Sequence, residues 1–345
     1  MRALVLTSLG GPDALAERDV AAPALLAPTD VRIRVHAAAI NRLDLFVTEG
    51  LPGISLDFPH IVGTDAAGVV ESVGAAVRTV RPGDRVMVNP GISCGACATC
   101  LAGDQPLCKH FGVLGEHRPG TVAELLVVPE SNVARAPDAM TWAEVAAFSL
   151  ATLTAWRMLI TRARLVPGES VLVWGAGGGV AQASIQIAAL TGASVIATSA
   201  SDGKLARAKQ LGAEHLVNHA TSDIVAEVKR ITGRRGAQVV VDSVGEATWP
   251  RSLRCLARGG RLVTCGGTSG PMVGLDVRKL FWHQWSILGS TMGSHAEYAA
   301  VTALAAAGKL WPVVDEVVPL ARGADAFRRL ARGEQSGKLV IEVTA

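Results

Sequence analysis

The apolar positions of the chain follow different patterns in its two halves. In the first 150 residues, short runs rich in β-branched residues are broken by glycine and proline turns, such as the turn at Arg81–Asp84. This pattern predicts an antiparallel, barrel-like domain. From residue 170 onwards, apolar strands alternate with helical patterns. Alternation in units of about 30 residues predicts a parallel, doubly wound sheet, so we expect an α/β protein of two domains.

The segments around the predicted sheet mark the domain boundaries. A helix is expected to begin at Thr141, because Thr141 and Glu144 form a capping-box pattern ahead of an apolar run. The tail holds one helical pattern and short strands, and it is expected to pack on the first domain. We predict domains at 1–150 and 151–288, with a returning segment at 289–345. The six predicted strands lie within 170–179, 193–201, 213–219, 237–245, 260–270 and 285–292.

Composition narrows the class of protein. The chain has 345 residues, of which 49% are hydrophobic and 18% charged, which excludes a disordered protein. The net charge of +3 is too small to indicate nucleic acid or an anionic membrane as a partner. We find neither an apolar run of about 18 residues nor the long apolar segment of a signal peptide. A cytoplasmic protein is therefore expected.

Four of the six cysteines lie close together, at Cys94, Cys97, Cys100 and Cys108. In a reducing compartment such a cluster is typical of metal ligands rather than of disulfides. Four thiolates can surround one tetrahedral zinc ion and leave no position open for water, which predicts a structural zinc. An iron–sulfur cluster is the alternative.

A glycine-rich turn joins the first predicted strand of the sheet to a helix. Glycines at this place let the backbone approach a pyrophosphate, whose charge then lies at the helix N-terminus. The turn therefore predicts a nicotinamide dinucleotide site. The residues expected there are Gly175, Gly177, Gly178, Gly179 and Val180.

The end of the next strand bears on the choice of dinucleotide. An acidic residue there would bind the ribose 2′-hydroxyl and repel a 2′-phosphate, but Ser199 occupies the position. Ser201 can donate a further hydrogen bond, and Lys204 adds a positive charge. Asp202 lies beyond the decisive position. These residues favour NADPH over NADH.

Taken together, these features resemble the medium-chain dehydrogenase/reductase superfamily, which includes zinc alcohol dehydrogenases and NADPH quinone reductases. The resemblance covers essentially the whole chain. It implies a GroES-like catalytic domain with a zinc lobe at about 91–110, a Rossmann domain, and a homodimer or homotetramer, for which the aromatic stretch at 282–292 offers a surface. The segments that carry it are VGTDAAGVVESVG at 62–74, RPGDRV at 81–86, the cysteine lobe, GTVAELLVVPE at 120–130, the glycine turn and GKLVIEV at 337–343.

The catalytic zinc site of the zinc alcohol dehydrogenases is not preserved. Asn41, Thr64 and Leu150 stand where the resemblance places cysteine, histidine and cysteine ligands, and Phe46 replaces the proton-relay histidine. Lowering an alcohol pKa from about 15.7 to about 7 is worth roughly 12 kcal/mol. Single hydrogen bonds of about 1–3 kcal/mol do not replace a metal. The sequence therefore favours an NADPH-dependent reductase of quinones or α,β-unsaturated carbonyl compounds, without a catalytic metal.

Roles follow for several residues. We expect Asn41 to bond the substrate carbonyl or the nicotinamide ribose, Asp44 to orient Asn41, and Thr64 to face the nicotinamide. His117 is the candidate proton donor at neutral pH. The resemblance adds further cofactor-binding residues, namely Thr154, His219, Ser243, Gly266, Gly267, Thr268 and Lys338.

Two other functions stay open. One is an alcohol dehydrogenase with substitute metal ligands, for which Asp65, His60 and His117 are candidates. The other is a non-catalytic protein that binds NADPH at an intact glycine turn. The substrate in either enzymatic case is a small molecule that the sequence does not name.

Overall fold

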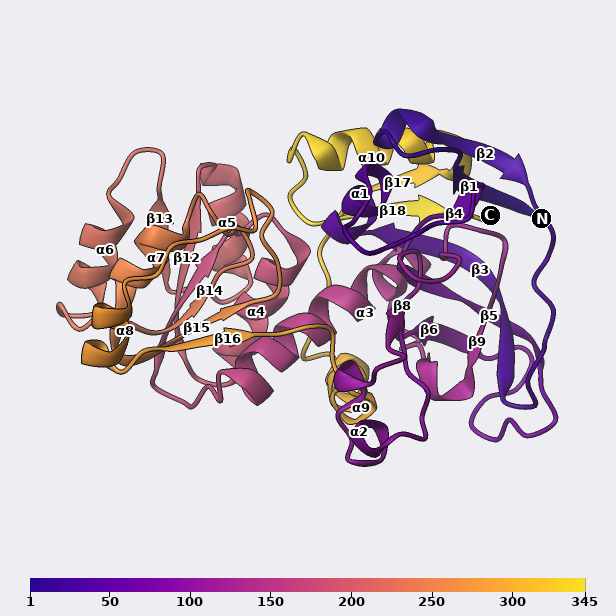
Figure 1. Ribbon diagram of the computed structural model, residues 1–345, viewed down its shortest axis with the longest axis horizontal. Coiled ribbons are helices and arrows are strands. Elements are labelled where there is room, and N and C mark those ends of the chain that lie inside the picture. The colour runs from indigo at the N-terminus through magenta and orange to yellow at the C-terminus, as the bar shows by residue number, and fades with distance from the viewer. Residues whose placement is uncertain (345) are drawn as a thin grey trace. The chain divides into compact units, whose positions relative to one another are not determined.

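The computed structural model describes residues 1–344, which form two compact units (Figure 1). Unit 1 comprises Met1–Ala151 and the chain from Gly293 onwards, and unit 2 comprises Thr152–Met292. The first boundary falls one residue from the predicted one, and the second falls four residues later. The second boundary is later because Gly289 is the last residue of β16, and the residues that follow it, up to Met292, still belong to unit 2.

The strands of unit 1 pair antiparallel, as predicted, except for β17 and β18 of the returning tail, which pair parallel. Its largest sheet has the order β10-β6-β5-β3-β18-β17, with β9 also paired to β3, and smaller sheets join β2-β1-β4 and β7-β8. The strands are β1 (Arg2–Leu6), β2 (Leu15–Asp19), β3 (Asp30–Ile40), β4 (His60–Ile61), β5 (Asp65–Val73), β6 (Arg85–Val88), β7 (Gly91–Ile92), β8 (Gly112–Val113), β9 (Leu125–Pro129), β10 (Val133–Arg135), β17 (Val314–Pro319) and β18 (Lys338–Glu342). The helices are α1 (Arg42–Glu49), α2 (Ala98–Leu101), the first part of α3 (Trp142–Trp156), α9 (His295–Ala306) and α10 (Gly323–Ala331).

The C-terminal tail completes this unit, as the sequence predicts. Strand β18 pairs antiparallel with β3, from Leu339 opposite Ile40 to Glu342 opposite Ala37. The tail contains two helices rather than the single one expected, because α10 is a short amphipathic helix whose apolar face, including Phe327 and Leu330, is buried.

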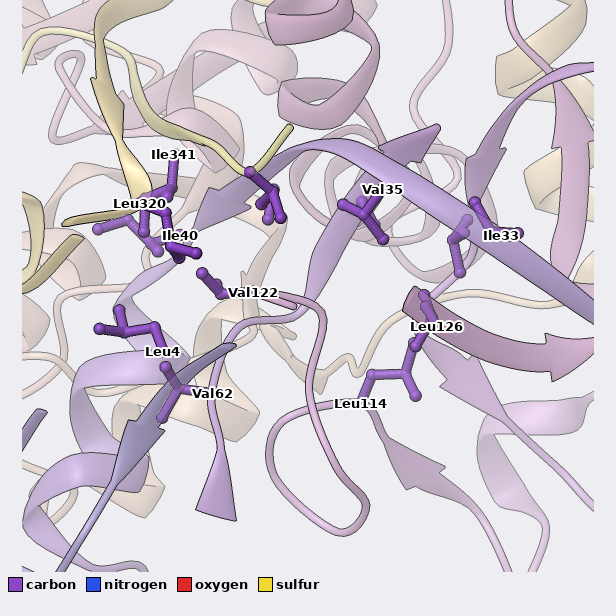
Figure 2. Close-up of a cluster of buried hydrophobic side chains, with 14 of the residues drawn as sticks. Leu4, Ile33, Val35, Ile40, Val62, Leu114, Val122, Leu126, Leu320 and Ile341 are labelled. Carbon is purple, nitrogen blue, oxygen red and sulfur yellow. The ribbon is translucent and has the colours of Figure 1, made fainter. Parts of the chain in front are cut away.

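The core of unit 1 joins residues that are far apart in the sequence. Figure 2 shows Leu4, Ile40, Val62 and Ile341 gathered in one cluster of buried side chains. Along β3, the residues Val31, Ile33 and Val35 are buried at alternate positions, as expected of a strand with one face on a core. This packing fixes the starts of α1 and of β18, which carry the buried polar side chains of the candidate site.

Unit 2 is a six-stranded, fully parallel sheet of order β13-β12-β11-β14-β15-β16, as predicted. The order reverses between β11 and β14, which is where such sheets bind ligands. The strands are β11 (Ser170–Trp174), β12 (Ser194–Ser199), β13 (His215–Asn218), β14 (Ala237–Val241), β15 (Leu256–Thr264) and β16 (Ser286–Gly289). The helices are the end of α3, α4 (Gly179–Leu190), α5 (Asp202–Gln210), α6 (Ile224–Ile231), α7 (Trp249–Cys255) and α8 (Val277–His283).

Helix α3 begins with the predicted capping box and continues further than expected. The Thr141 amide donates to Glu144 Oε2 at 2.8 Å, and the Glu144 amide donates to Thr141 Oγ1 at 3.3 Å. The helix runs on through a π-helical segment, Arg157–Arg162. By length and composition alone, Trp142–Arg162 would suffice to cross a membrane, but 78% of its apolar window is buried within the protein, as in a core helix.

Candidate active site

The four cysteines of unit 1 form one cluster of sulfur atoms. The distance between the Sγ atoms is 3.9 Å for Cys94 and Cys100, 3.5 Å for Cys97 and Cys100, and 3.5 Å for Cys94 and Cys108. A tetrahedron with Zn–S bonds of about 2.3 Å requires S–S distances of about 3.8 Å, so the four sulfurs fit zinc. Among residues 1–344 they are the only group of at least three candidate ligands found within 4.8 Å of one another.

A buried polar network occupies the place where the sequence lacks the catalytic zinc ligands. Helix α1 begins directly after Asn41, whose backbone amide donates to Asp44 Oδ2 at 2.6 Å. The side-chain Nδ2 of Asn41 donates to Thr64 Oγ1 at 2.8 Å and to Asp65 Oδ2 at 2.9 Å. Thr64 Oγ1 in turn lies 3.1 Å from Asp44 Oδ2. The end of β3 and the start of β5 thus hold four polar side chains together.

Lys338, the first residue of β18, supplies the cation of this network. Its Nζ donates to Asn41 Oδ1 and, at 3.0 Å, to Asp65 Oδ2. Because an ammonium group only donates, the Asn41 atom that it contacts must be the oxygen, which fixes the orientation of the amide. Asp65 Oδ1 accepts the backbone N–H of Leu150 at 2.8 Å. The residue at the position of the third zinc ligand therefore contributes its main chain to the same network.

The network contains two carboxyl groups and one ammonium group, all removed from water. The side chains of Asp65 and Lys338 are 0% and 5% exposed. Burial raises the pKa of the Asp44 carboxyl to about 7 from its ordinary 3.8, and the Asp65 carboxylate acts in the same direction. The Asn41 amide, the Lys338 ammonium and the Thr64 hydroxyl oppose the rise. A substantial fraction of Asp44 is thus protonated at neutral pH.

These contacts change what Asn41 and Thr64 can do. Both hydrogens of the Asn41 side chain are donated inside the network, and the Thr64 hydroxyl donates to Asp44 while that carboxyl is ionised. To bond a substrate or the nicotinamide, the two side chains would have to give up these hydrogen bonds for new ones. The roles predicted for Asn41 and Thr64 stay predictions. Asp44 Oδ2 accepts the Asn41 backbone amide, and the predicted role of Asp44 in orienting Asn41 stays a prediction. Lys338 engages the network, and its predicted contact with a pyrophosphate stays a prediction.

Among residues 1–344, His60, His117 and Asp65 do not form a group of candidate metal ligands. His60 Nε2 is 2.9 Å from the Gly115 carbonyl, so this nitrogen carries a hydrogen and is not free to bind a metal. His117 Nδ1 accepts the Val113 amide at 3.3 Å, which places the hydrogen of the neutral ring on Nε2. The His117 side chain is 37% exposed, and its role as proton donor stays a prediction.

In unit 2 the glycine turn has the geometry that a dinucleotide requires. Gly175 has φ +71°, a left-handed conformation that favours glycine, and a Cβ there would meet no atom within 4 Å. Gly178 caps helix α4, which begins at Gly179 and has no side-chain cap at its N-terminus. The first amides of α4, including that of Val180, have no partner within the helix and can bind a phosphate.

The predicted NADPH-selecting residues lie at the ends of β12 and β13. Ser199 Oγ accepts the Ser201 amide at 3.1 Å, and Ser201 caps α5 by accepting the Lys204 amide. His219 Nδ1 lies 2.8 Å from Thr198 Oγ1. Burial lowers the pKa of the His219 imidazole, so the ring is neutral at pH 7.

Asp202 is already engaged, because its Oδ1 accepts a hydrogen bond from Asn218 Nδ2 at 2.7 Å. The acidic residue nearest the predicted 2′-phosphate position therefore has a partner of its own. Thr154, on the buried part of α3 within unit 2, contacts Met292 Sδ at 4.0 Å.

The loops that follow β14 and β15 contain the other predicted cofactor residues. The Thr268 amide and hydroxyl both donate to the Ser243 carbonyl, at 3.3 and 3.1 Å. Gly266 and Gly267 lie in the same loop, directly after β15. The sequence did not single out Asp242, whose fully buried carboxylate holds the turn after β14. The sequence did contain a signal for this residue, because Asp242 follows an apolar strand directly and precedes a turn with serine and glycine.

Comparison with known proteins connects both units to dehydrogenases. Residues 27–138 match the family of alcohol dehydrogenase GroES-like domains, and residues 179–307 match the zinc-binding dehydrogenase family. A zinc-type alcohol dehydrogenase-like protein of Schizosaccharomyces pombe is 30% identical over 351 aligned positions, which cover 99% of each chain. A quinone oxidoreductase of Homo sapiens is 29% identical, covering 99% of this chain and 97% of its own.

A solved structure, described as an NAD-dependent alcohol dehydrogenase, has the same fold. It is 44% identical to this chain, with a TM-score of 0.96 and complete coverage of both chains. The relatives thus include both alcohol dehydrogenases and a quinone reductase.

Proposed function

Because the chain belongs to the medium-chain dehydrogenase/reductase superfamily and is an oxidoreductase, we propose that it transfers hydride from NADPH to a quinone or to the β-carbon of an α,β-unsaturated carbonyl compound. The reaction proceeds without a catalytic metal. When bound, the dinucleotide supplies the hydride.

The buried network of Asn41, Thr64, Asp65 and Lys338 is the observation that carries this proposal. Zinc is held in catalytic sites by thiolate, imidazole or carboxylate ligands with one position open. Here the side chains at the first two ligand positions are a neutral amide and a hydroxyl. Of the two carboxyl groups beside them, Asp65 accepts from Lys338 and Asn41, and Asp44 accepts from the Asn41 main chain and the Thr64 hydroxyl. The ammonium group already supplies the cation that the Asp65 carboxylate needs.

Reduction of an activated acceptor requires less help than oxidation of an alcohol. The negative charge that hydride addition creates is delocalised onto a carbonyl or quinone oxygen, so a hydrogen-bond donor and a proton source suffice. His117, exposed and with Nε2–H directed away from Val113, is the proposed proton source.

A single structural zinc in the cysteine lobe is part of the proposal. The sulfur separations of 3.5 to 3.9 Å fit one tetrahedral ion bound by Cys94, Cys97, Cys100 and Cys108. Such an ion would stabilise a lobe whose regular structure is limited to the single turn of α2 and a two-strand pairing.

NADPH is proposed as the preferred dinucleotide. Ser199 stands at the end of β12 where an acidic side chain would repel a 2′-phosphate, and the carboxylate of Asp202 is held by Asn218 Nδ2. The NAD-dependent relatives favour the opposite choice, so the ratio of KM for NADPH and NADH is the deciding quantity.

Alcohol dehydrogenation is the second candidate, because the structural relative that is 44% identical carries that description. It would require a second metal ion in unit 1. His60 does not offer Nε2 for such an ion, since that nitrogen donates to Gly115.

We also propose that two copies associate through β16 and α8. Strand β16 is the last in the sheet order, and on α8 the side chains of Phe281 and Trp282 are 65% and 66% exposed. Exposed aromatic side chains beside a sheet edge are typical of subunit contacts. Size-exclusion chromatography with light scattering tests this part of the proposal.

The function itself is tested by metal analysis combined with a substrate screen. We expect about one zinc per subunit, and oxidation of NADPH by 1,4-benzoquinone or 2-cyclohexenone that persists after dialysis against EDTA. Oxidation of simple alcohols should be negligible under the same conditions. About two metal ions per subunit, with alcohol oxidation that EDTA abolishes, would establish the second candidate instead.

A further inference from the structure

Two loops at the carboxyl edge of the unit 2 sheet are joined into one surface. The loop after β14 spans 242–248, and the loop after β15 spans 265–276, of which the first part, 265–270, makes the contacts with the loop after β14. The Ser269 amide donates to the Val244 carbonyl at 2.8 Å, and the Glu246 amide donates to the Gly270 carbonyl at 3.2 Å. Main-chain bonds thus run between the loops in both directions, as between neighbouring strands.

Asp242 anchors the first loop from inside the protein. Its Oδ1 accepts the amides of Val244 at 2.9 Å and Gly245 at 3.1 Å. Its Oδ2 accepts the hydroxyls of Thr248 at 2.8 Å and Ser252 at 2.6 Å. Charge-assisted bonds to a fully buried carboxylate are strong, so the first loop is rigid on its own.

The loops also approach too closely to tolerate side chains at their contact. Gly245 has φ +87°, and a Cβ there would lie 2.5 Å from the Gly270 carbonyl oxygen. The same Cβ on Gly245 would lie 2.9 Å from the Gly267 Cα, so the main chains of the two loops are in direct contact.

The side chain of Ser269 bonds to the first loop at two places. Its hydroxyl donates to the Val244 carbonyl at 2.8 Å and accepts the Ala247 amide at 2.9 Å. The residue is exposed, where a serine hydroxyl would ordinarily bond to water. Both bonds instead connect the second loop to the rigid first one.

We propose that Ser269 is a positioning residue for dinucleotide binding, whose hydroxyl fixes the loop after β15 on the loop after β14. The two loops then present one preformed backbone surface beside the glycine turn. This inference rests on the proposed dinucleotide-dependent function. A preformed loop raises affinity because its conformational entropy is lost before binding rather than during it.

The test compares Ser269→Ala with Ser269→Thr in the full-length protein. The alanine variant lacks both hydroxyl bonds, and we expect its Kd for NADPH, measured by fluorescence titration, to rise about five- to tenfold. At saturating NADPH its kcat should stay within about twofold of wild type. Ser269→Thr keeps the hydroxyl and should restore the affinity, whereas Ser8→Ala, at an exposed serine of unit 1, should have no effect.

Hydrogen exchange provides a readout that is independent of catalysis. In Ser269→Ala the amides of Glu246, Ala247 and Gly270 should exchange faster, while those of β11 are unchanged. An alanine variant that binds NADPH as tightly as the wild type would overturn this inference alone. A wild-type protein that binds neither NADPH nor NADH would overturn the proposed function as well.

Discussion

The cysteine lobe and the buried network of unit 1 are two polar clusters that stabilise the protein in opposite ways. In the lobe, four sulfurs from one short segment surround a space that fits one metal ion. In the network, side chains from α1, β5 and β18 satisfy one another, with the ammonium of Lys338 as the internal cation. The first cluster needs an ion from solution, and the second needs a residue almost 300 positions away in sequence.

The contrast gives a physical reason why four zinc ligands are present in one place and absent in another. A lobe with little regular structure would depend on the proposed zinc for folding, so each cysteine would be required. The network position lies on strands already held by the core of unit 1, and the fold survives without a metal once its buried charges are paired. Four predictions test this contrast.

Cys100→Ser should have the largest effect. The buried Cys100 sulfur contacts two other cysteines, and removing it would leave three ligands for a zinc site whose binding is worth about 10–16 kcal/mol in small peptides. We expect zinc content to fall from about one per subunit to near zero, with rapid proteolysis within residues 91–110. A variant that retains its zinc and its protease resistance would contradict the dependence of the lobe on the ion.

Lys338→Met should be the next most severe change. It leaves the Asp65 carboxylate buried without its cation, and breaking a buried pair costs about 3–5 kcal/mol. Urea unfolding should show this loss, while the zinc content stays at the wild-type value. Lys338→Arg keeps the charge and serves as the control. Equal stability of the methionine variant and the wild type would show that the ammonium is dispensable.

Asp44→Asn should change the pH dependence of stability. Burial raises the folded-state pKa of Asp44 to about 7, above the ordinary 3.8, so folding favours the protonated form. Its contribution is complete below pH 4 and is lost as the pH rises to about 7, at up to about 1.4 kcal/mol per pH unit. Unfolding of the wild type at a series of pH values should show this slope, and the asparagine variant should lack it. An identical slope in both proteins would contradict the assignment to Asp44.

His117→Gln should have the smallest effect, because His117 lies outside both clusters in the loop that follows β8. If its imidazole donates the proton, turnover should fall about three- to tenfold, and the pH profile should lose its limb near neutrality. Steady-state kinetics between pH 5 and 9 provide the measurement. Unchanged turnover and an unchanged pH profile would exclude the residue as proton donor.

The sequence predicted most of the fold because local patterns specify it. The six strands of unit 2, the capping box of α3 and the pairing of the tail with unit 1 are confirmed. Helix α10 was missed because it is only nine residues long and its buried apolar side chains, Ala326, Phe327 and Leu330, span little more than one turn.

Within the candidate site, short-range and long-range features separate clearly. The sequence by itself determined the cysteine cluster, the glycine turn and the absence of the expected zinc ligands at Asn41 and Thr64, because each is a matter of residue type and local spacing. Only the tertiary structure decided that Lys338 lies against Asn41 and Asp65, and that Ser269 reaches Val244. Those contacts join segments far apart along the chain, and their geometry is set by the packing of strands, which no local pattern records.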